Sequence, residues 1–133
     1  MLRRTLLVLA VFAPLPVQAL APAYQHRGYA AHYRPGLMER VAQRRGMPQT
    51  PCMVATPYVA LGRWVQVQSR KNGQVLRCRV TDVPHPKDIP LLRKRNIVIE
   101  LNFSSARILC NIHRTGQEPP RACPVTLRPI AGH

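Results

Sequence analysis

The sequence predicts a small all-β domain of about six strands with one short helix, cross-linked by two disulfides. Short segments alternate apolar and polar residues with the period of two that a half-buried strand requires. An Asn72-Gly73 pair separates two of these segments, and this dipeptide is a strong hairpin signal. Four cysteines occur in a chain of 133 residues that starts with the features of an export signal. At this length a single domain is expected.

Residues 1–19 have the three parts of a secretory signal peptide. Arg3 and Arg4 precede an apolar run over 6–13, and Val17-Gln18-Ala19 offers small residues for cleavage after Ala19. The run is far shorter than the roughly 20 residues of a membrane span, so we expect no membrane anchor and a periplasmic or secreted protein. We divide the chain into this signal peptide, a short lead (20–27), a folded domain (28–128) and a tail (129–133).

The charge of the chain is strongly unbalanced, with 20 lysines and arginines against five acids and a formal net charge of +15. The acids, too few for a calcium or magnesium cage, are Glu39, Asp82, Asp88, Glu100 and Glu118. Basic surfaces bind anions, which for an exported protein means peptidoglycan or another anionic envelope polymer. Export and the lack of a nucleic-acid motif argue against nucleic acid. Arginine-rich codon usage would explain part of the charge without any function.

Four cysteines in a short exported chain favour two disulfides. They allow three pairings, and sequence alone does not choose among them. We favour Cys52–Cys78 and Cys110–Cys123, because the second pair flanks a Gly- and Pro-bearing segment that a bridge would staple. The rival interpretation is a metal site, supported only by Cys110-x-x-His113. Because no Cys-x-x-Cys pair is present, we expect no metal and no cofactor.

The first half of the domain contains four expected strands. Tyr29, Ala31 and Tyr33 alternate with smaller or polar neighbours in the first strand, over 29–33. Residues 37–50 are expected to hold one helical turn and otherwise loop, because Gly46 and Pro48 interrupt them. A brief apolar run follows over 52–55, and 64–68 and 75–80 flank Asn72-Gly73 as a hairpin whose second strand is half buried.

The second half contains a loop, two strands and the helix. Residues 81–90 include three prolines, Asp82 and Asp88, so we expect a constrained loop, which is a common place for function. Residues 97–101 form a β-branched strand, and 102–110 change to helical spacing with Asn102 or Ser104 as the N-cap. A polar loop over 111–121 leads to a closing strand over 124–127.

Several motifs occur in a characteristic order: Ala30-Ala31-His32-Tyr33-Arg34-Pro35-Gly36, Leu61-Gly62-Arg63-Trp64-Val65-Gln66-Val67, Asn72-Gly73, Arg79-Val80-Thr81-Asp82, Ile97-Val98-Ile99-Glu100-Leu101, Ser105-Ala106 and Cys123-Pro124-Val125. Over about Gly28 to Leu127 they resemble the RlpA-like double-psi β-barrel family, related in fold to expansins and barwin-type domains. The resemblance implies a six-stranded double-psi β-barrel that binds cell-wall polysaccharide across one face. The lipid-bearing cysteine of the founding lipoprotein has no counterpart before Cys52, so we expect no lipidation.

In catalytic members the resemblance implies lytic cleavage of peptidoglycan glycan strands, with Asp82 at the position of the acid. One acid protonates the leaving glycosidic oxygen and the sugar's own hydroxyl closes a 1,6-anhydro ring, so one carboxylate suffices, unlike in ordinary glycosidases. Two family features are absent. The Gly-Glu-x-Phe-Asp motif falls near 46–50, where there is no acid, and the family histidine falls on Thr56.

The candidate site residues each have a second interpretation. The cations Arg79, His85 and Lys87 favour an ionised Asp82, which suits a structural ion pair or loop cap better than a general acid. Tyr33 and Trp64 offer aromatic faces for sugar rings, although a lone tryptophan in a barrel is more often core.

Thr56 and Arg79 complete the expected substrate-binding set, and Glu100 is interpreted as the partner of an arginine. Three functions follow for what we expect to be a monomer: a lytic transglycosylase acting through Asp82, a non-catalytic expansin-like wall-binding module, and a secreted cationic polyanion-binding protein. The last would show salt-sensitive binding without glycan preference.

Overall fold

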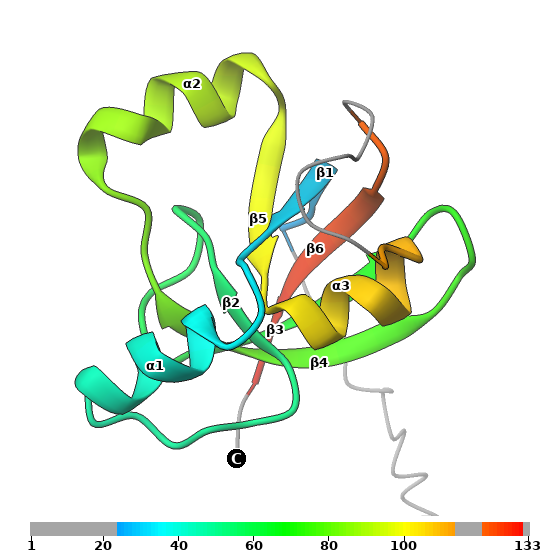
Figure 1. The fold of residues 1–133 in the computed structure, drawn as a ribbon. Helices are drawn as coiled ribbons and strands as arrows, with labels where there is room; N and C mark the ends of the chain where they lie inside the picture. The colour runs from blue at the N-terminus through cyan, green and yellow to red at the C-terminus, as the bar shows by residue number, and fades with distance from the viewer. Residues whose placement is uncertain (1–23, 114–120, 132–133) are drawn as a thin grey trace, which may run out of the picture.

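The computed structural model describes residues 24–113 and 121–131, in which six strands close into a barrel (Figure 1). The strands are β1 (His26–His32), β2 (Met53–Ala55), β3 (Trp64–Ser69), β4 (Val75–Asp82), β5 (Ile97–Leu101) and β6 (Pro124–Ile130). They pair in the order β1-β5-β2-β4-β3-β6. The β1–β5 and β2–β4 pairs are parallel and the other four are antiparallel. The prediction of six strands is confirmed, whereas the predicted signal peptide lies outside the described residues.

The interior of the barrel is filled by aliphatic side chains from alternate strand positions. Val65 and Val67 of β3 are fully buried, and Gln66 between them faces outward. The same alternation buries Cys78 and Val80 of β4, as the half-buried pattern of 75–80 predicts. The rest of this hydrophobic core comes from the remaining four strands and from α3, and includes Val54, Leu101, Leu109, Val125 and Leu127. Closure leaves no unpaired sheet edge between these strands.

Helices cover parts of the outside. The described residues contain α1 (Leu37–Arg44), the 3₁₀ turn η1 (Pro86–Asp88), α2 (Ile89–Lys94) and α3 (Phe103–Cys110), so the expectation of one short helix was too low. No helix in this part of the chain is long and apolar enough to cross a membrane.

The extra helices have local explanations. α1 extends to two turns because Met38 and Ala42, four residues apart, are buried together against Met53 and Ala55 of β2. In the expected loop over 81–90, Pro86 is the first residue of η1 and Pro90 the second residue of α2, where a missing N–H costs nothing. Prolines therefore begin these helices instead of preventing them.

Both predicted disulfides are present, Cys52–Cys78 and Cys110–Cys123, with Cα atoms 4.5 and 4.9 Å apart. The described residues contain no free cysteine. Because such bonds persist where thiols are not kept reduced, the pairs suggest an oxidising, extracytoplasmic environment.

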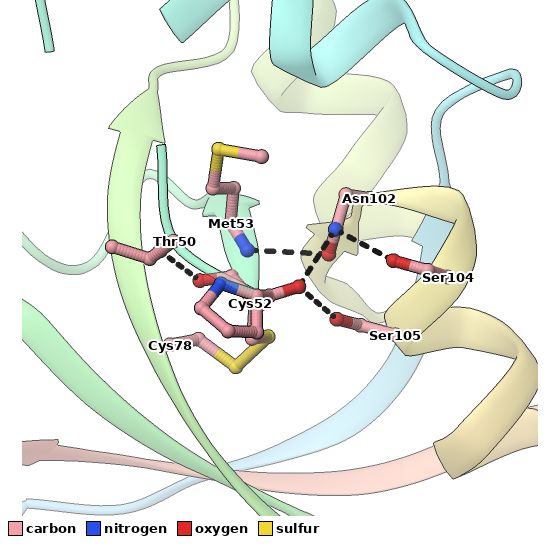
Figure 2. The surroundings of a disulfide bond; sticks show 8 residues. Thr50, Cys52, Met53, Cys78, Asn102, Ser104 and Ser105 are labelled. Atoms are coloured by element: carbon pink, nitrogen blue, oxygen red, sulfur yellow. Dashed lines mark hydrogen bonds between the residues drawn. A yellow bond between two sulfur atoms is a disulfide. The ribbon is translucent and has the colours of Figure 1, made fainter. Parts of the chain in front are cut away.

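Asn102 ties the start of α3 to the segment that leads into β2 (Figure 2). Its side-chain amide donates to the Pro51 carbonyl and the Ser104 hydroxyl at 3.0 and 3.1 Å, and its carbonyl accepts from the Met53 N–H at 3.2 Å. Asn102 occupies the predicted N-cap position, but its side chain does not cap the helix. Ser104 lies inside the helix. The Asn102 side chain therefore holds residues 51 and 53 beside the Cys52–Cys78 disulfide.

Candidate functional site

A β-bulge places Asp82 on the outside of the barrel. The pairing of β2 with β4 advances from Val54 opposite Val80 to Ala55 opposite Asp82, so Thr81 is an extra residue on β4. Val54 packs inside the barrel and Ala55 packs under α1. A bulge redirects side chains in this way, and the Thr81 hydroxyl accordingly lies against the Met38 sulfur at 3.2 Å. Asp82 therefore faces the side of the barrel that α1 covers.

The Asp82 carboxylate accepts hydrogen bonds on both oxygens. The Tyr33 hydroxyl donates to Oδ2 at 2.6 Å, and Oδ1 accepts from Arg45 Nη2 at 2.6 Å and from the Val83 N–H at 2.9 Å. Tyr33 follows β1, and Arg45 is the C-cap residue directly after α1. These contacts join β1, α1 and β4 through one side chain that is 15% exposed. The arrangement is an ion pair, with Arg45 in place of the expected Arg79, His85 or Lys87.

Glu100 and Asp82 lie on opposite sides of the same β2 residue, two strands apart. Glu100 pairs with Ala55 on one side and with Ala31 of β1 on the other, so Asp82, Ala55 and Glu100 are neighbours across β4, β2 and β5. With strands about 4.8 Å apart, the two acidic positions are about 10 Å apart on one face. Burial raises the pKa of Glu100, and the charges of Asp82 and Asp88 raise it further.

The interpretation of Glu100 as an arginine's partner was wrong. Its electrostatic neighbours are carboxylates, and no arginine forms an ion pair with it among the described residues. A carboxyl group that is desolvated beside like charges holds its proton more tightly, which is the behaviour that a general acid requires. Glu100 is the functional candidate that sequence reasoning missed.

Tyr33 contacts Asp82 and lies near enough to Glu100 to be affected by its charge. The pKa of Tyr33 is raised, first by burial, then by the hydrogen bond to Asp82 and by the nearby charges of Glu100 and Asp82, so it remains a neutral donor. Its ring is half buried against the cluster of Met38, Ala42, Met53 and Ala55. Tyr33 and Asp82, both expected in the site, are therefore in direct contact.

The other expected binding residues lie apart from that contact. Thr56 is fully buried, and its hydroxyl donates to the Val98 carbonyl at 2.8 Å and accepts from the Tyr58 N–H at 3.3 Å. Trp64 and Arg79 come together instead on the outside of β3 and β4, with the Arg79 guanidinium 5.5 Å from the indole centroid. The structure thus gives a Tyr33–Asp82 pair and a Trp64–Arg79 pair, and the buried Thr56 belongs to neither.

Within 24–113 and 121–131, no three His, Cys, Asp or Glu side chains are grouped closely enough to hold a metal ion. No protein-family model and no curated protein matches the sequence. The barrel and the side chains described above are therefore the basis on which a function can be proposed.

Proposed function

We propose that this chain is an exported double-psi β-barrel protein that binds bacterial peptidoglycan, and that Asp82 anchors the site structurally. The closed six-stranded barrel with two parallel pairs is compatible with the double-psi topology that the motifs imply. The two disulfides fit an oxidising compartment.

The observation that carries the structural role of Asp82 is that donors occupy both oxygens of its carboxylate. Tyr33, Arg45 and the Val83 N–H all require Asp82 to accept hydrogen bonds. An acid for glycosidic cleavage must instead donate a proton to the leaving oxygen. This favours an expansin-like module that binds the wall over an enzyme that acts through Asp82.

A second candidate, lytic cleavage with Glu100 as the acid, is favoured by the raised pKa of that carboxyl. In this reaction Glu100 gives its proton to the glycosidic oxygen as the bond to the anomeric carbon breaks. The C6 hydroxyl of the same sugar then attacks the anomeric carbon and returns its proton to Glu100. Bond making and bond breaking balance without water or a second nucleophile.

The test incubates the oxidised protein with purified peptidoglycan and measures both the pelleted protein and the soluble products, the latter by mass spectrometry. A binding module pellets with the wall and releases no anhydro-sugar, and Asp82→Asn and Glu100→Gln leave its binding unchanged when they fold. Anhydro-sugar products that disappear in Glu100→Gln would establish the second candidate. Products that disappear only in Asp82→Asn would overturn the structural role of Asp82.

A matched competition separates wall binding from general attraction to anions. Double-stranded DNA and heparin are added over a range of concentrations to the protein bound to peptidoglycan. Peptidoglycan binding that survives an excess of either polyanion supports the proposal. Equal preference for all three polymers would favour a cationic polyanion-binding protein instead.

A further inference from the structure

A second surface lies on the outside of β1, β6, β3 and β4, away from the Glu100 site. Gln66 of β3 has Arg77 of β4 on one side and Arg128 of β6 on the other. Trp64 pairs in the same way with Arg79, and Arg27 of β1 lies opposite Thr126 of β6. We call this surface the arginine face and define it by Arg27, Trp64, Gln66, Arg77, Arg79 and Arg128.

These side chains point outward because their neighbours along each strand fill the barrel. Val65 and Val67 of β3 are buried, as are Val125 and Leu127 of β6. Since side chains alternate across a strand and residues directly opposite share a side, the members of the arginine face lie on one surface.

Among the described residues, the guanidinium groups of this face have no acidic partner. The ion pair in this part of the chain is Arg45–Asp82, which involves none of the four arginines of the face. The Arg79 Nε is buried without a hydrogen-bond partner. The described acids lie elsewhere, on α1, the end of β4, η1 and β5. The face therefore carries uncompensated positive charge.

Trp64 orients two of the arginines. The Arg77 and Arg79 guanidinium carbons lie 4.6 and 5.5 Å from the centroid of its ring. A guanidinium held over an indole by cation–π attraction keeps N–H groups at its edge, where they can bind a carboxylate through two hydrogen bonds. The Trp64 ring therefore holds the Arg77 and Arg79 guanidinium groups side by side on the outside of the barrel.

The spacing of the face suits a partner with repeated anions. Arg77 and Arg128 are separated by one strand, so their backbone positions are about 10 Å apart. Several weak contacts with one polymer reinforce each other through a high effective concentration. A single small anion would use one arginine and gain nothing from the others.

We propose that the arginine face binds the stem-peptide carboxylates of peptidoglycan, at a surface separate from the Glu100 site. This inference rests on the proposed wall-binding function. It adds the chemical group that is recognised and the residues that recognise it. The charge of the face is complementary to carboxylates that recur along the polymer, and the disulfides fit a compartment where that polymer occurs.

The experiment compares an Arg77→Gln/Arg128→Gln variant with a charge-matched Arg44→Gln/Arg93→Gln control. The control arginines are exposed on α1 and α2, so both variants lose the same charge. Binding to intact peptidoglycan and to glycan strands stripped of stem peptides is measured by pelleting over a series of salt concentrations. Thermal unfolding of both variants checks that the barrel is intact.

The face variant should bind intact peptidoglycan about tenfold more weakly, because two arginine–carboxylate contacts are lost. Its binding should also depend less on salt, and binding to stripped glycan should not change. Equal weakening in the control, or none in the face variant, would overturn the inference. The face would be assigned to another polymer if the face variant also bound stripped glycan equally more weakly. The same would follow if DNA of matched charge displaced the wild-type protein from peptidoglycan. A wild-type protein that pellets with neither wall preparation would refute wall binding itself.

Discussion

The replacement of Asp82 by Asn should lower the free energy of unfolding by about 2 kcal/mol, whether or not the protein cleaves anything. The largest part comes from Tyr33, whose half-buried hydroxyl donates to the carboxylate at 2.6 Å. A hydrogen bond to a charged group contributes about 1.5–3 kcal/mol. The Arg45 side chain is 38% exposed, so its ion pair adds less than about 1 kcal/mol. Asparagine keeps one carbonyl oxygen and recovers part of the loss.

Urea unfolding of the oxidised protein, followed by far-ultraviolet circular dichroism, measures this loss. Tyr33→Phe, Asp82→Asn and the double variant form a thermodynamic cycle that isolates the contact between the two side chains. We expect a coupling energy of at least about 1 kcal/mol. Arg45→Gln serves as the comparison, because removing the exposed partner should cost less than removing the carboxylate.

Two results would refute this account of Asp82. One is an Asp82→Asn variant within about 0.5 kcal/mol of the wild type, the range of a neutral surface substitution. The other is strict additivity of Tyr33→Phe and Asp82→Asn, which would mean that the 2.6 Å contact contributes nothing to stability. In either case Asp82 would be free for catalysis and the binding-module proposal would lose its main support.

Three further predictions concern the disulfides, Glu100 and Gly28. Replacing both cysteines of Cys52–Cys78 by alanine should lower the free energy of unfolding in urea by about 3.5 kcal/mol, and the same change at Cys110–Cys123 by about 2.9 kcal/mol. The first loss is larger because that disulfide closes a longer loop, with a separation of 26 residues against 13; the reverse order would contradict this. The folded state holds the Glu100 proton more tightly than the unfolded chain, so the stability from that proton is present below the ordinary pKa of 4.5 and is lost as the pH rises through the raised value. Glu100→Gln should therefore have a higher free energy of unfolding than the wild type at pH 7 but not at pH 3. The same difference in free energy of unfolding between variant and wild type at both pH values would show that the pKa is not raised. Gly28→Ala should destabilise the barrel by about 2 kcal/mol or more, because the new Cβ would lie 2.5 Å from the Asn96 carbonyl oxygen and 2.7 Å from a Val98 methyl; an unchanged melting temperature would count against this packing.

The strands could be predicted because their local pattern carries the information. Residues 97–101 match β5 at both ends, and the predicted 64–68 strand differs from β3 by one residue. Alternation identifies which side chains enter the barrel before any pairing is known. α1 and α2 were underestimated because Gly and Pro were interpreted only as interruptions. In fact α1 is stabilised by contacts with β2, which no local pattern reveals.

The site was only half predictable for a related reason. Asp82 and Tyr33 were both identified, but their contact joins residues 49 apart, and that of Asp82 with Arg45 joins residues 37 apart. The position of Glu100 beside Asp82 depends on strand register and on the bulge at Thr81. A shift of one residue would place Asp82 inside the barrel. Register is a property of the assembled sheet, so sequence reasoning assigned Glu100 the wrong partner.

The arginine face and the Glu100 site are adjacent along β4, which carries Arg79 and ends at Asp82. Arg79 belongs to the arginine face and Asp82 lies three residues further along the same strand, about 10 Å away. A wall polymer held by Arg77 and Arg79 would extend past the end of β4 toward Glu100. If Glu100 cleaves glycan, arginine-face variants should therefore raise KM and leave kcat unchanged, whereas Glu100→Gln should lower kcat. If the protein only binds, the arginine-face variants alone should have an effect. The arginine-face variant and Glu100→Gln together thus separate an enzyme with a remote binding surface from a module that consists of that surface.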